Sequence, residues 1–164
     1  MRPSPEPAVV EPGTGNHALD LTQLSVGELL LIWALRTRVA RGPNGPVTGF
    51  RLAFGLAGIE RALANFEALF SLLQQRTDGG FAVHDPACRW ISPDEIQVMS
   101  LLAAFQAGRS GYAHMLASRM VEGAVFGNLI DCAEKFASQM RRHKLDLPLR
   151  GWIYLVSDQT RSVH

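Results

Sequence analysis

The most constraining feature of the sequence is a regular series of large apolar residues in its second quarter. They alternate steps of four and three over about three heptads: Leu52, Leu56, Ile59, Leu63, Phe66, Phe70 and Leu73. Alanines and Leu69 widen this stripe, which predicts one long central helix of a bundle and not a two-stranded coiled coil. Gly55 and Gly58 either let another helix approach closely or delay the start of the helix.

Two capping boxes mark where further helices begin. Residues 25–28 and 92–95 both have the S-x-x-E pattern, in which serine and glutamate satisfy the backbone donors of a first helical turn. The first box predicts a helix that ends near Arg41, before a loop with two prolines and two glycines. The second predicts a helix over about 93–107, ended by the glycines of 108–111.

The remaining chain predicts further helices and an extended end. Apolar residues at helical spacing over 112–120 and 126–140 indicate two helices or one bent helix. The β-branched and aromatic run 152–156 favours a short C-terminal β-strand or an extended tail. We therefore expect an all-α fold, an irregular bundle of about five helices. Residues 1–20 form a flexible Pro/Gly-rich arm and residues 21–164 a single helical domain.

Composition limits the classes of protein to which the chain can belong. With 164 residues, of which 47% are hydrophobic, it can bury one core without disulfide or metal staples. Its 16 basic and 15 acidic residues give a formal net charge of +1, so no charge excess favours a nucleic-acid partner. Two cysteines suit a reducing compartment. Neither a membrane span nor a secretory signal is apparent, so we expect a cytoplasmic protein.

Candidate chemistry is sparse. His84 and Cys88 are four residues apart and are the best metal ligands in the sequence, but a second close pair is missing, whereas structural zinc sites usually have two. Cys88 also lies beside Arg89 and near a predicted helix start, two features that lower a thiol pKa. A cysteine enzyme also needs an oriented histidine and an oxyanion hole, which no spacing here indicates. We expect no cofactor and no enzymatic activity.

One segment resembles the opening of LuxR-type helix-turn-helix domains. The resemblance spans about twenty residues and is carried by Ile91 to Glu95, Val98, Leu101 to Ala103, and Gly108. It implies a DNA-binding unit over 92–140, in which a basic third helix would enter the major groove. That third helix, over 123–140, has no arginine or lysine before Lys135. A nucleic-acid partner is therefore not expected, and a divergent helix-turn-helix regulator is an alternative.

The main functional prediction is an interaction surface. Because only 19% of residues are charged, polar side chains cannot cover every apolar stripe, and aromatic residues are common interface anchors. We expect a small non-enzymatic regulatory or interaction domain, a homodimer that binds a partner protein through an apolar helical face. The candidate contact residues are Trp33, Phe54, Trp90 and Trp152. A further alternative is an apolar small-molecule pocket between helices, lined by Met99, Phe105, Tyr112, Met115 and Met120.

Overall fold

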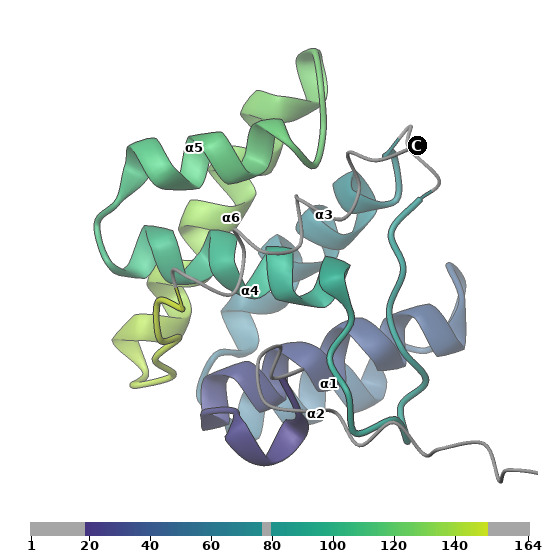
Figure 1. Ribbon diagram of the computed structural model, residues 1–164. Helices are drawn as coiled ribbons and strands as arrows, with labels where there is room; N and C mark the ends of the chain where they lie inside the picture. The colour runs from purple at the N-terminus through teal and green to yellow at the C-terminus, as the bar shows by residue number, and fades with distance from the viewer. Residues whose placement is uncertain (1–18, 77–79, 151–164) are drawn as a thin grey trace, which may run out of the picture.

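The computed structural model describes residues 19–76 and 80–150, and within these ranges it is helical without a strand (Figure 1). The six α-helices are α1 (Val26–Arg41), α2 (Thr48–Leu56), α3 (Leu63–Leu73), α4 (Pro93–Gln106), α5 (Ser110–Ser118) and α6 (Ala124–Arg142). Two short 3-10 helices, η1 (Leu21–Gln23) and η2 (Glu60–Ala62), precede α1 and α3. The predicted all-α bundle is confirmed. The expected strand over 152–156 and residues 1–18 of the expected arm lie outside the described residues.

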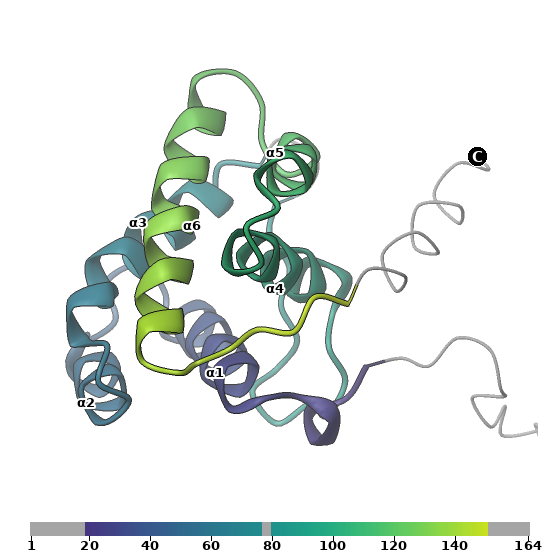
Figure 2. The same cartoon turned by 90° about the vertical axis from the view of Figure 1, so that its left-hand side faces the viewer.

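Helix α6 is the centre of the bundle. It packs against α3 on one side and α4 on the other, and α5 also contacts both α4 and α6 (Figure 2). Three phenylalanines join α2, α3 and α6: the ring centroid of Phe66 lies 5.5 Å from that of Phe54 and 5.9 Å from that of Phe136. Helices α1 and α2 lie next to each other at one end of the molecule in both views. The core thus joins elements from the whole described chain.

The predicted long helix through residues 52–73 is wrong, because the chain turns between Leu56 and Leu63. Gly58 has φ of +79°, in the left-handed region that favours glycine. The N–H of Ile59 donates to Phe54 O at 2.8 Å, and the N–H of Gly58 donates to Gly55 O at 3.0 Å. These two bonds form a Schellman motif, which ends α2. The periodic series is therefore shared between two helices that meet at a corner.

The other predicted boundaries agree with the structure. Both capping boxes are formed: Ser25 with Glu28 begins α1, and Ser92 with Glu95 begins α4. Gly108, at φ of +71°, follows the end of α4 as expected. The segment after it is two helices, α5 and α6, and not one bent helix. Local capping and glycine signals therefore place these helix ends correctly.

The folded part of the chain includes the last two residues of the expected arm. Leu19 is 4% exposed and belongs to the hydrophobic core. Asp20 caps η1 and forms an isolated antiparallel bridge with Trp90. The Asp20 carboxylate also contacts the Arg89 guanidinium at 3.0 Å. From Leu19 onward, the chain is therefore attached to residues 80–92, which we call the connector before α4.

Candidate interaction surface

The solvent-exposed side of α1 is apolar. Val26, Leu29 and Trp33, which we call the α1 outer face, follow one another at i, i+3 and i+7 and therefore share one side of the helix. Their exposed fractions are 72%, 40% and 38%. Every exposed residue of α1 before Arg41 is uncharged. A surface helix normally presents charged and polar residues to water, so α1 departs from the usual pattern.

The charged residue at the centre of α1 instead points inward. Arg36 is 2% exposed, and its guanidinium donates to both carboxylate oxygens of Glu95, at 2.6 and 3.0 Å. The same guanidinium donates to the carbonyl oxygens of Asp85, Cys88 and Trp90, at 3.3, 2.5 and 2.6 Å. These five bonds use the five N–H groups that an arginine has. Arg36 therefore fixes the connector before α4 against α1.

A second inward charge lies at the start of α1. Glu28 is 1% exposed, and its carboxylate accepts the backbone N–H of Ser25 at 2.7 Å. Arg150 donates to the same carboxylate at 2.9 and 3.0 Å. A buried charge is tolerated only when it is paired and hydrogen-bonded, and both conditions hold here. Because Glu28 and Arg36 occupy inward positions, the exposed side of α1 before Arg41 consists of uncharged, mainly apolar residues.

The four predicted contact residues differ in their exposure and in their place in the fold. Trp33 and Trp90 are each 38% exposed, which agrees with the expectation. Trp33 belongs to the α1 outer face, and its ring lies 5.5 Å from that of Phe50. Trp90 lies on the connector, where the Arg89 guanidinium is 4.9 Å from its ring. Trp152 lies outside the described residues.

The expectation that Phe54 is exposed is wrong. Its side chain is 0% exposed, whereas Leu52 and Leu56, which were expected to be buried, are 65% and 83% exposed. The reason is the corner at Gly58: α2 ends there and turns its own inner side, with Phe50 and Phe54, toward the core. The apolar residues from Leu52 to Leu73 would share one side only if a single helix contained all of them.

The five residues of the predicted small-molecule pocket have different environments. Met99 and Met120 are buried in the hydrophobic core, and Phe105 and Tyr112 pack partly against it. Met115 is 42% exposed on α5. Two cavities that the structure shows, both beside α6, are lined by other residues. A ligand pocket among the five therefore stays a prediction.

The candidate metal ligands and reactive thiol, His84 and Cys88, do not lie in a cluster of ligand side chains within the part of the chain that the structure describes. His84 is exposed and Cys88 is partly buried, both on the connector before α4. Residues 19–76 and 80–150 contain no group of three or more His, Cys, Asp or Glu side chains that could hold a metal ion. Burial, and secondarily the charge of Asp131, raises the pKa of the Cys132 thiol. Cys132 therefore remains protonated at neutral pH, as expected for a packing residue.

The helices α4, α5 and α6 follow in the order that the LuxR resemblance implies. The cation expected to come first on α6, Lys135, forms an ion pair with Asp131 at 2.8 Å. Exposed residues before it on α6 include Asn128 and Asp131 and no cation. The outer side of α6 thus presents both signs of charge, whereas a recognition helix needs cations for phosphate.

Comparisons with known proteins add no relative: no family model, no curated protein and no solved structure matches the chain. None of the described helices is long and apolar enough to cross a membrane.

Sequence reasoning missed Val26 and Leu29 as surface residues. Leu29 was not singled out in the sequence, and Val26 entered only as part of the capping box over residues 25–28. The signal was present in the charges, because Glu28 and Arg36 lie two helical turns apart and share a side. Whether this charged side of α1 is buried depends on Glu95 and Arg150, the ion-pair partners of Arg36 and Glu28, which are distant in sequence.

Proposed function

We propose that this chain is a small non-enzymatic interaction domain that forms a homodimer through the α1 outer face. The observation that carries the proposal is that α1 is apolar on its exposed side as well as toward the core, while its charged residues Glu28 and Arg36 are buried in ion pairs. Single exposed apolar residues are common on monomers, but a continuous stripe on one helix is typical of a surface covered by protein. Free Cys88 and Cys132 fit a reducing compartment such as the cytoplasm.

A second copy of the chain is the occupant that this stripe fits best. Two copies related by a two-fold axis can place the same uncharged helix side against itself, without bringing like charges together. A standard interface buries about 800 Å² on each partner, so residues beside α1 must contribute. Leu52 and Leu56 on α2 are exposed, and the contact of the Trp33 ring with Phe50, on the inner side of α2, places α2 beside α1. We therefore include the outer side of α2 in the interface.

The experiment compares the molar mass of three proteins by size-exclusion chromatography with light scattering. Wild type should elute as a dimer and Leu29→Glu as a folded monomer, because a charge in the middle of a symmetric apolar interface meets its own copy. Met115→Glu is the matched control, since Met115 on α5 is 42% exposed and Leu29 is 40% exposed. Circular dichroism checks that all three are folded.

The proposal fails if wild type is a monomer at the highest soluble concentration. It fails equally if Leu29→Glu stays dimeric with native helix content, since the contact would then involve another surface. A wild-type monomer whose α1 outer face is protected on adding a different protein would identify a heterologous partner in place of the second copy.

A further inference from the structure

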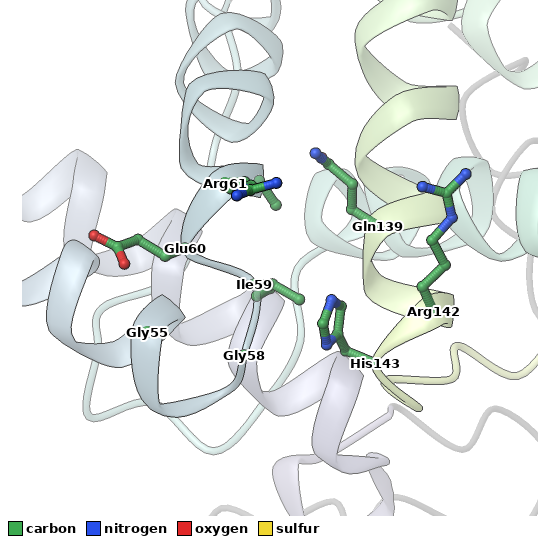
Figure 3. A pocket seen from close by; sticks show the side chains of 9 residues that line it. Gly55, Gly58, Ile59, Glu60, Arg61, Gln139, Arg142 and His143 are labelled. Atoms are coloured by element: carbon green, nitrogen blue, oxygen red, sulfur yellow. The ribbon is translucent and has the colours of Figure 1, made fainter.

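A cavity of about 460 Å³ lies between the corner that joins α2 to α3 and the end of α6. Gly58, Ile59 and Arg61 line it from the corner, and Gln139, Arg142 and His143 line it from α6 and its C-terminal cap (Figure 3). Arg61 and Gln139 point toward each other across the space, while the carboxylate of Glu60 points away from it. The volume falls in the range of small-molecule sites.

Three of the polar side chains that line this cavity, Arg61, Gln139 and Arg142, offer hydrogen-bond donors to it, and the imidazole of His143 can donate or accept. The Oε1 atom of Gln139 accepts from Asn65 Nδ2 at 2.9 Å, which leaves the amide NH₂ group available to the cavity. Guanidinium groups only donate. Arg61, Arg142 and Gln139 therefore supply donors and two positive charges, with no carboxylate directed at the same space. Such a set fits an anion.

Arg61 and Arg142 differ from the arginines that hold the fold together. Within the described residues, neither guanidinium has a hydrogen bond or an ion pair, whereas Arg36, Arg38 and Arg76 each contact a carboxylate. Arg142 also borders an adjoining cavity of about 430 Å³, where Asp131 and Glu134 lie. Asp131 is paired there with Lys135. The donor capacity of Arg61 and Arg142 is thus not used by the fold.

The corner keeps this cavity open through Gly58. A Cβ atom on Gly58 would lie 3.1 Å from His143 Nδ1, which is closer than most side-chain contacts allow. The apolar residue Ile59, 2% exposed, forms part of the wall below the donors. The cavity thus combines a charged side with an apolar side, as a site for an organic anion requires.

We infer that this cavity binds the phosphate group of a small phosphomonoester. A phosphate has three terminal oxygens and about two negative charges near pH 7, which match two guanidinium charges and the Gln139 amide better than a carboxylate does. The apolar wall at Ile59 accommodates the organic part. The inference does not rest on the proposed dimer: the cavity lies at the corner and α6, away from the α1 outer face, and only Gly55 of α2 brings it near the proposed contact at Leu56.

The test is isothermal titration calorimetry of the full chain with phenyl phosphate, and benzoate as the carboxylate probe. Phenyl phosphate should bind saturably, more tightly than benzoate, and with the same affinity to Leu29→Glu. Arg61→Gln and Arg142→Gln should each lower the affinity by about tenfold or more, because each removes a charge-assisted hydrogen-bond donor. Arg109→Gln is the matched control: Arg109 is exposed, at the start of α5, and outside both cavities.

A second measurement on the wild type does not depend on any variant. In two-dimensional NMR, phenyl phosphate should shift the backbone amide signals of Gly58, Ile59 and His143 and leave those of α5 in place. Absence of saturable binding would overturn the inference. So would equal affinity for benzoate, or binding that is unchanged in both Arg61→Gln and Arg142→Gln.

Discussion

Helices α1 and α6, with 16 and 19 residues, are the two longest helices of the described chain, and they meet water in opposite ways. The exposed positions of α6 include Asp131, Glu134 and Lys135, while its apolar residues face the core. On α1 the exposed positions include Val26 and Leu29, and Glu28 and Arg36 face inward. The exposed side of α6 is therefore suited to water, whereas the exposed side of α1 is, as proposed, covered by protein.

The largest change in stability is expected at Arg36, the central charge of α1. In Arg36→Met the Glu95 carboxylate stays buried without its partner, and loss of one member of a buried pair costs about 3–5 kcal/mol of unfolding free energy. Urea denaturation followed by circular dichroism measures this. Adding Glu95→Gln should restore part of the loss, since the uncharged amide keeps a capping oxygen. On α6, Lys135→Met should lower the urea midpoint at neutral pH only slightly, because its pair with Asp131 is exposed.

An apolar stripe like that of α1 can be introduced on the exposed side of α6. Glu134→Leu with Ser138→Leu puts two apolar side chains at i and i+4 on the exposed side of α6. In the Leu29→Glu background this double variant should self-associate, with roughly 1–3 kcal/mol of association free energy from the newly buried area. Light scattering over a concentration series measures it. A strictly monomeric double variant would show that an apolar stripe alone does not drive dimer formation.

A smaller change in unfolding free energy is expected from substitutions where the α2–α3 corner meets the end of α6. Gly58→Ala should lower the unfolding free energy by roughly 1–2 kcal/mol, because an alanine at φ of +79° is strained and its Cβ would crowd His143. Gly55→Ala is the matched control, since Gly55 is inside α2 and a Cβ there meets nothing within 4 Å. That variant should raise the unfolding free energy by up to about 1 kcal/mol. Both values come from urea denaturation.

The smallest effects on stability are expected from two charges near the surface, Asp20 before α1 and Lys135 on α6. The side-chain hydrogen bond from Thr22, and then Arg89, lowers the pKa of Asp20 below 3.8. Its stabilising contribution is therefore full above that value and is lost as the pH falls through the lowered pKa. The hydrogen bond to Asp131 raises the pKa of Lys135 above 10.5, so its contribution is full below that value and is lost at higher pH.

Urea midpoints measured across these two pH windows test the assignment. Asp20→Asn should flatten the acidic limb of the profile and leave the alkaline limb intact. Lys135→Met should flatten the alkaline limb and leave the acidic limb intact. An acidic limb that is identical in wild type and Asp20→Asn would show that Asp20 is not held by Thr22 and Arg89 in solution.

The sequence predicts those features that depend on a few neighbouring residues. The boxes at Ser25 and Ser92 fix helix starts because the serine and the glutamate bond to backbone groups within one turn. The corner at Gly58 escaped prediction because apolar residues spaced by three and four suit one long helix as well as two short ones. The left-handed glycine was the available signal, but Gly55 competes with it in the sequence.

The exposed apolar side of α1 was predicted only in part, because its position depends on partners distant in the sequence. Trp33 was identified from its residue type alone, as an aromatic that suits an interface. Leu29 became a surface residue because Arg36 pairs with Glu95, which is 59 positions away. Arg61 and His143 likewise come together only in the folded chain. No local pattern encodes such contacts.

The bonds of Arg36 to three carbonyl groups also bear on the order in which the molecule opens. The connector before α4 has no regular secondary structure, and a single side chain of α1 holds its backbone at Asp85, Cys88 and Trp90. When α1 separates from α4, the connector loses these acceptor contacts at the same moment. Amide hydrogen exchange in α1, the connector and the first turn of α4 should therefore share one opening free energy, as a single cooperative unit.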